Sequence, residues 1–218
     1  MTIKAVVFDF DGTLMDTETY AYEAFSSVYT EHGHELKLED WALGIGTHGG
    51  FDPYTDLEER LGRTIDRDVV EARYNELHEE KLIHTTPRPG VIARLEEARS
   101  LGWAIGLASS SPHAWIEKYL QKLGIREYFS VIRSADDVEK VKPDPALYLL
   151  AAEALGVRPE EAIAIEDSMN GLRAAVAAGM YAIVTPNPVT KHMDFTGAKL
   201  IVNSLEEIRF ADLKDEEN

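Results

Sequence analysis

Short apolar runs alternate with amphipathic stretches along most of this chain. The first run, Ile3–Phe8, is apolar apart from Lys4, which is typical of a strand that is buried on both faces of a parallel sheet. Strands that alternate with helices favour an α/β fold, a doubly wound parallel sheet with a Rossmann-like core. Further strands are expected at Trp103–Ala108, Val131–Ile132, Ala162–Ile165, Tyr181–Val184 and Leu200–Val202.

Capping signals mark the helices that are expected between these strands. Ser111-Pro112 and Asp144-Pro145 each place a favoured cap residue before a proline, which predicts that a helix starts at each site. Val91–Leu101 is expected to form a helix that ends at a glycine, and Ser168–Ala178 is expected to form the helix after the fourth strand.

The segment between the first two strands has helical rather than strand periodicity. Asp16 is expected to cap a helix that ends at Gly33, and Asp66–Leu82 repeats the helical pattern. Thr85–Gly90, rich in proline and threonine, is expected to be a linker back to the core. The sequence therefore predicts two domains: a helical cap over residues 16–86, and a core formed by residues 1–15 and 87–218.

Composition excludes several functional classes. The 218 residues carry 39 acidic against 22 basic side chains, a net charge of -17, whereas nucleic-acid binders normally show a clustered basic face. The chain has no cysteine, which excludes disulfides, cysteine-bound zinc and thiol nucleophiles. No apolar run has membrane-spanning length. We therefore expect a cytoplasmic monomer with neither a nucleic-acid nor a membrane partner.

Polar residues follow the predicted strands in an order that suits one reaction. Asp9 and Asp11 end the first strand, and ligands of open α/β sheets bind at that edge. Ser109 follows the second strand, Lys142 precedes a capped helix, and Glu166-Asp167 follow the fourth strand. A carboxylate nucleophile, a cation and acidic metal ligands are what phosphoryl transfer requires.

Each of these groups also has a simpler interpretation when it is taken alone. Ser109–Ser111 are suited to a turn and a helix cap, Lys142 to a solvated surface, and Asp167 to capping of the next helix. Their order behind two acids at the end of the first strand favours the functional interpretation. Asp144 is interpreted as a helix cap only.

Four motifs give the chain a resemblance to the haloacid dehalogenase-like hydrolase superfamily, specifically to its helical-cap phosphatases and β-phosphoglucomutase-like proteins. The resemblance covers essentially the whole chain, and it implies a magnesium-dependent phosphatase that acts on a small phosphomonoester. The motifs are DFDGT at Asp9–Thr13, LASSS at Leu107–Ser111, KPDP at Lys142–Pro145 and EDSMNG at Glu166–Gly171.

Individual roles follow from the resemblance. It implies that Asp9 attacks phosphorus to form an aspartyl phosphate, and that Asp11 protonates the leaving oxygen and later takes a proton from water. Ser109 and Ser110 would bind the phosphate, and Lys142 would bridge the phosphate and the nucleophile.

The resemblance also implies a magnesium site. Asp167 would bind Mg²⁺ with Asp9 and the backbone carbonyl of Asp11. Glu166 either binds the ion or orients a residue that does, and both remain open. Magnesium prefers oxygen ligands and keeps some of its waters, which agrees with so small a set of carboxylates.

A glycine-dense loop, Gly44–Gly50, is expected to lie in the cap. It either closes over the substrate, with Thr47 and His48 as substrate-binding side chains, or it simply connects two helices. Related sugar phosphomutases carry an arginine in this loop for the second phosphate, whereas this loop ends in Gly49-Gly50. The phosphatase is therefore favoured, and a sugar phosphomutase with the same nucleophile is the alternative.

Two further classes share the aspartate chemistry. A dehalogenase needs neither a metal nor a second acid, so Asp11 and Asp167 argue against it. A signalling receiver domain has no insertion after its first strand, so the helical segment 16–86 argues against that class.

Overall fold

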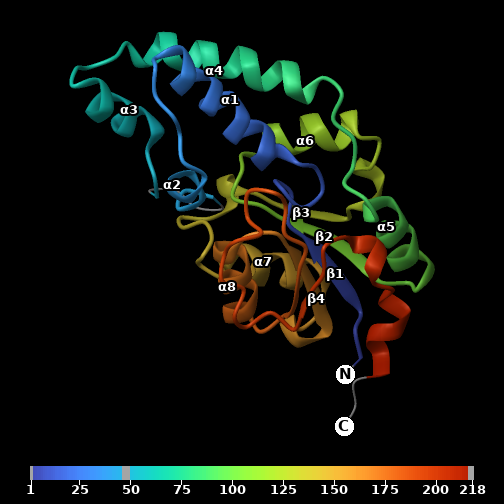
Figure 1. Cartoon of the computed structure of the whole chain (residues 1–218). Coiled ribbons are helices and arrows are strands. Elements are labelled where there is room, and N and C mark those ends of the chain that lie inside the picture. The colour runs from blue at the N-terminus through green and yellow to red at the C-terminus, as the bar shows by residue number, and fades with distance from the viewer. Residues whose placement is uncertain (1, 46–49, 216–218) are drawn as a thin grey trace.

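The computed structural model of the chain describes residues 2–45 and 50–215, and it confirms the doubly wound α/β fold (Figure 1). Its sheet is parallel throughout, in the order β3-β2-β1-β4-β5-β6. The strand order reverses at the central strand β1, so its carboxyl end is the expected ligand site. The strands are β1 (Ala5–Phe8), β2 (Ala104–Ala108), β3 (Val131–Arg133), β4 (Ala162–Glu166), β5 (Tyr181–Val184) and β6 (Leu200–Ile201).

Helices cover both faces of the sheet. On one face α5 (Val91–Ser100) and α6 (His113–Lys122) pack with the larger buried cluster, and on the other face α7 (Ala146–Leu155) and α8 (Met169–Ala178) pack with the second. Alternate residues of β1 belong to the two clusters, Val6 to the first and Val7 to the second, which is why the strand is apolar at successive positions. Short 3₁₀ segments lie at Arg126–Tyr128, Ala135–Asp137, Pro159–Glu161, Leu205–Glu207 and Phe210–Asp215.

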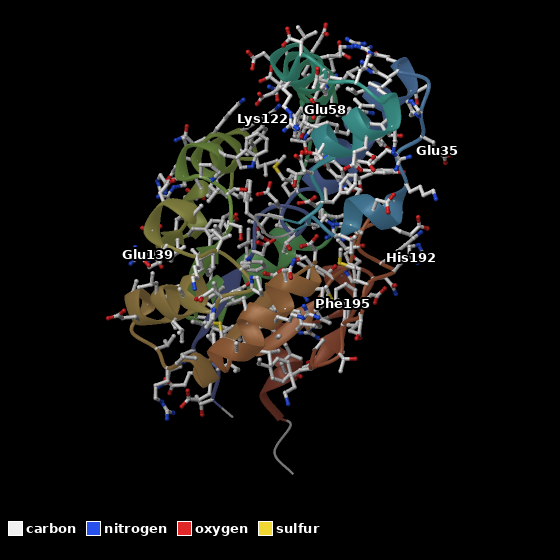
Figure 2. The ribbon with its side chains drawn as sticks, turned by 90° about the vertical axis from the view of Figure 1, so that its left-hand side faces the viewer. Glu35, Glu58, Lys122, Glu139, His192 and Phe195 are labelled. Carbon is white, nitrogen blue, oxygen red and sulfur yellow. The ribbon has the colours of Figure 1, made fainter. Side chains whose placement is uncertain are left out.

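The segment between β1 and α5 forms a helical insert at one end of the sheet, where α1–α4 gather (Figure 1). It resembles a cap and has its own buried cluster, which is built around Phe25, Val28 and Tyr29. Figure 2 shows the same two parts from another side, with Glu35 and Glu58 on the insert and His192 and Phe195 on the core. The helices are α1 (Thr17–Glu31), α2 (Leu38–Ala42), α3 (Pro53–Leu61) and α4 (Arg67–Leu82).

The predicted cap at Asp16 is confirmed, because its side chain accepts a hydrogen bond from the backbone N–H of Thr19 at 3.2 Å. The helix predicted from Ser168 is capped by that residue, which accepts from the N–H of Gly171 at 3.1 Å. At α7, Pro145 occupies the cap position, and Asp144 before it accepts from the N–H of Ala146. Of the described helices, none is both long and apolar enough to cross a membrane.

The prediction for Ser111 is wrong. Helix α6 begins at His113, and Pro112 occupies the cap position rather than the first helical position. The backbone N–H of His113 donates instead to the carboxylate of Asp136 at 2.9 Å, so a distant residue satisfies the start of the helix. The Ser111 hydroxyl is thereby left for another partner, described below.

Candidate active site

Residues from four loops meet in one pocket at the carboxyl ends of the strands. The pocket has a volume of about 250 Å³, which is small beside the roughly 300–1,000 Å³ of sites for drug-sized ligands. The structure therefore brings the predicted core residues together in a space that suits a small substrate. The core contributes Asp9, Asp11, Ser109, Ser110, Ser111, Lys142, Asp167 and Ser168 to its lining.

Lys142 is the central cation of this site. Its side chain is buried, and its ammonium donates to Oδ1 of Asp9 and to Oε1 of Glu166, each at 2.6 Å. Burial acts to lower the pKa of Lys142, but the two carboxylates outweigh it and hold the pKa above its ordinary value. The alternative of a solvated surface lysine is excluded.

Glu166 is fully occupied by protein donors. Oε1 accepts from Lys142 and from the Tyr148 hydroxyl at 2.6 Å, and Oε2 accepts from the N–H of Asp167 at 3.2 Å and from Ser168 at 3.3 Å. Its carboxylate lies against Gly171, where an added Cβ would come within 2.0 Å of it. The glycine of the EDSMNG motif therefore makes room for this buried acid.

Three buried acids lie close enough together to share a cation. One oxygen from each of Asp9, Glu166 and Asp167 lies within 4.8 Å of the others. Oδ2 of Asp9 is buried and has no hydrogen-bond partner within the described part of the chain. Burial, against the attraction of Lys142, raises the pKa of Asp9 to about 7. Three carboxylates that lie this close together offer hard oxygen ligands, which fit a divalent ion such as Mg²⁺.

Asp167 is held by residues from two other loops. Its Oδ2 accepts from the Asn187 amide at 2.6 Å, and its Oδ1 lies 3.5 Å from the Thr13 hydroxyl. Burial, followed by the charges of Asp9 and Glu166, raises the pKa of Asp167 well above its ordinary value. Asn187 carries no signal in the sequence, because it lies in an irregular loop after β5 and belongs to none of the four motifs.

Gly12 makes this approach of Asp167 sterically feasible. It has a φ of +78°, and an added Cβ would lie 2.2 Å from Oδ2 of Asp167. Both the backbone conformation and the contact exclude a side chain at this position.

Asp11 is held apart from this cluster by its own donors. Oδ2 accepts from the Ser111 hydroxyl at 2.5 Å, and Oδ1 accepts from the Trp115 indole N–H at 3.0 Å. Burial raises the pKa of Asp11, and these two hydrogen bonds act against the rise. Neither partner of Asp11 could be predicted from the sequence, since contacts between residues 100 or more positions apart leave no local pattern.

The remaining predicted residues divide into two groups. Ser109 is buried and its hydroxyl accepts from the N–H of Ser111 at 3.0 Å, while Ser110 lines the pocket beside it. Thr47 and His48 lie outside the described residues.

The helical insert closes the other side of the pocket. It contributes one ionisable side chain, Glu18, in the first turn of α1, among the described lining residues. Asn170, in the last core motif, donates to the Ile45 carbonyl at 2.9 Å and so contacts the insert directly. The other lining residues of the insert are Trp41, Gly44, Ile45, Phe51 and Pro53.

Arg88 lies in the segment expected to be a linker, and its side chain connects two loops of the site by hydrogen bonds. Its guanidinium donates to the carbonyl of Gly12, to that of Thr185 at 2.9 Å and to that of Pro186 at 2.8 Å. The segment that leads back to the core is therefore part of the scaffold of the site.

Comparison with known proteins agrees with this geometry. A family model described as "Hydrolase: haloacid dehalogenase-like hydrolase" matches residues 3–179. A protein of Bacillus subtilis (strain 168) named "Putative phosphatase YhcW" is 44% identical over 216 residues, which cover 99% of this chain and 98% of the relative. The "Phosphorylated carbohydrates phosphatase" of Thermotoga maritima is 34% identical over 184 residues, with 82% of each chain covered.

The likeness extends to solved structures. The crystal structure of CbbY from Rhodobacter sphaeroides, in complex with phosphate, superposes with a TM-score of 0.73 at 31% identity, covering 94% of this chain and 96% of that chain. The chain therefore belongs to the haloacid dehalogenase-like hydrolase family. Within that family it is a hydrolase of the phosphatase type.

Proposed function

We propose that this chain is a magnesium-dependent phosphatase that hydrolyses a small phosphomonoester through an aspartyl phosphate on Asp9. The strongest support for this proposal is the environment of Asp9. Its Oδ1 accepts a hydrogen bond from Lys142, and its Oδ2 has no hydrogen-bond partner within residues 2–45 and 50–215. Such a carboxylate is oriented by one oxygen while the other stays available for attack on phosphorus.

Two steps complete the reaction. Asp9 forms a bond to phosphorus while the bond to the leaving oxygen breaks, and Asp11 gives its proton to that oxygen. A water then attacks the phosphorus, Asp11 takes a proton from it, and Asp9 is regenerated as inorganic phosphate leaves. Lys142, Ser109 and Ser110 hold the phosphate oxygens, and Lys142 balances the charge that gathers there.

Asp9, Asp167 and the backbone carbonyl of Asp11 are the groups that we propose to hold Mg²⁺. When bound, the ion neutralises charge on the carboxylates and on the transferring phosphate. For Glu166 we propose orientation of Lys142 rather than metal binding, because protein donors already occupy both of its oxygens.

Phosphorylated sugars or polyols are the substrates that we propose, with residues 16–86 as the cap that covers them. Relatives support this substrate class: besides the carbohydrate phosphatase, "Hexitol phosphatase B" of Escherichia coli is 34% identical over 220 residues. A mutant of CbbY has been crystallised with xylulose-(1,5)bisphosphate. Thr47 and His48 stay predictions as substrate-binding residues.

Metal dependence gives the first test. Phosphate release from a panel of sugar and polyol monophosphates is expected to fall about 100-fold or more when EDTA removes the metal, and to return when excess Mg²⁺ is added. Retention of full activity in EDTA, after dialysis against the chelator, contradicts the proposal.

Trp115 offers a test of the role of Asp11. Trp115→Phe keeps the aromatic ring but removes the N–H that Asp11 accepts. We expect kcat/KM for an alkyl phosphate to fall about tenfold, the value of a hydrogen bond to a charged group. With p-nitrophenyl phosphate, whose leaving group needs no proton, the loss should stay below about twofold.

Trp103→Phe is the matched control for this substitution, since Trp103 stacks on Phe210 and does not line the pocket. Equal losses with both substrates in Trp115→Phe would exclude a role for Trp115 through the acid.

The phosphomutase remains the alternative, and it can be separated directly. Its second phosphate needs a cation on the cap side, and the described cap lining contributes neither lysine nor arginine to the pocket. Incubation with a sugar bisphosphate and the matching monophosphates should release inorganic phosphate. Isomerisation without release would instead identify a mutase.

A further inference from the structure

Glu18 is a carboxyl group that the proposed mechanism does not use. It lies in the first turn of α1, is half-buried and lines the pocket beside Asp9 and Asp11. Its side chain has no hydrogen bond or ion pair with any other described residue. A fourth acid with no partner among the described residues is unexpected in a pocket that must receive a phosphate dianion.

The other charges of the pocket make an ionised Glu18 unfavourable. Burial, followed by the charges of Asp11 and Asp9, raises the pKa of Glu18 to about 8. Four acids line the described pocket and Lys142 is the only lysine or arginine among those lining residues. Asp9 and Lys142 belong to the phosphate end of the pocket, so no lysine or arginine of the described lining is left to compensate the charge of Glu18.

Position separates Glu18 from the phosphate-binding groups. Asp9, Ser109 and Lys142 come from the core, whereas Glu18 comes from the helical insert together with the rings of Trp41 and Phe51. A phosphomonoester that places phosphorus on Asp9 therefore directs its leaving group toward Glu18. The acid does not belong to the three-carboxylate metal cluster of the described chain.

We propose that Glu18 is a specificity residue that hydrogen-bonds a hydroxyl of the leaving group, so that the substrate is a phosphorylated polyol or sugar without a second anionic group. This inference rests on the proposed phosphatase activity and narrows its substrate class. A hydroxyl satisfies either protonation state of the carboxyl, since it can donate to the ionised form or accept from the neutral form. Trp41 and Phe51 supply apolar surface for the carbon skeleton.

A leaving group with a carboxylate or a second phosphate is disfavoured for the complementary reason. It would enter a pocket lined by four acids, and the described lining holds no second lysine or arginine to neutralise it. Selectivity thus arises from a hydrogen bond to the wanted substrate and from repulsion of the unwanted one.

The test compares three phosphomonoesters of similar size: glycerol phosphate, propyl phosphate and phosphoglycolate. Wild-type enzyme should prefer glycerol phosphate to each of the others by about tenfold or more in kcat/KM. Glu18→Leu should reduce the ratio of glycerol phosphate to propyl phosphate about tenfold. Glu18→Gln, which can still donate and accept, should restore most of that ratio.

Glu23→Leu is the matched control. Glu23 lies on the same helix, pairs with Lys81 at 2.7 Å and does not line the pocket, so its substitution should leave the ratio unchanged. An unchanged ratio in Glu18→Leu, an equal loss on all three substrates, or a wild-type preference for phosphoglycolate would each overturn the inference.

A failure of the phosphatase proposal can be distinguished from a failure of the Glu18 inference by a different measurement. Wild-type enzyme would then release no phosphate from p-nitrophenyl phosphate that depends on both Mg²⁺ and Asp9. If that release is present while the Glu18 ratios do not change, only the specificity inference is wrong.

Discussion

Asp9→Asn is expected to reduce phosphate release about 10⁴-fold or more at saturating substrate. The amide is a poor nucleophile, and the substitution also removes the one site carboxylate with a free buried oxygen in the described chain. Steady-state phosphate release with excess Mg²⁺ measures the loss. Residual activity above about 1% of wild type would contradict the nucleophile assignment.

Asp144→Asn is the matched control for this substitution. Asp144 accepts from the N–H of Ala146 at 3.0 Å at the start of α7, and asparagine caps helices as well as aspartate does. Activity should therefore be unchanged. In metal-free buffer, Asp9→Asn should unfold at no lower temperature than wild type, because it removes one charge from a crowded group of buried acids. A large drop in that temperature would mean that the loss of activity reflects misfolding.

Lys142→Met is expected to destabilise the fold by about 3–5 kcal/mol, which is the range for breaking a buried ion pair by removing one partner. The ammonium is shared by Asp9 and Glu166, so two buried carboxylates lose their cation together. Urea unfolding followed by circular dichroism measures the change. Phosphate release should fall about 10³-fold, because Lys142 lines the pocket and we propose that the same ammonium holds the phosphate.

Two further variants make the Lys142 result specific. Lys140→Met removes an exposed lysine two residues earlier and should change stability by less than about 0.5 kcal/mol. Adding Glu166→Gln to Lys142→Met should recover part of the lost stability, since one uncompensated charge is then removed. If Lys142→Met costs less than about 1 kcal/mol, the ammonium is not the main partner of these acids.

The fold was predictable because its signals are local. Apolar runs such as Ile3–Phe8 and Ala162–Ile165 indicate strands from their own residues alone. Asp16 and Ser168 likewise cap the helices that begin directly after them. Once a parallel sheet is expected, the carboxyl ends of its strands must meet at one edge. The grouping of Asp9 with the later motif residues follows from that geometry.

The support for these residues could not be predicted in the same way. Ser111 follows a strand and precedes a proline, so its pattern favours a cap, yet its hydroxyl reaches Asp11 across 100 positions. Trp115 and Asn187 likewise contact site acids through tertiary packing alone. Glu18 carries no motif signal, and its environment becomes evident only when the helical insert is folded over the sheet.

The peptide units of Gly12 also connect the site to the helical insert. The N–H of Gly12 donates to the Thr17 hydroxyl at 3.0 Å where the chain leaves the core, and its carbonyl accepts from Arg88 where the chain returns. Gly12, the residue after Asp11, is therefore hydrogen-bonded at both connections between the core and the insert. We therefore expect that a movement of the insert at either connection would be transmitted through Gly12 to Asp11, the residue that we propose as the general acid.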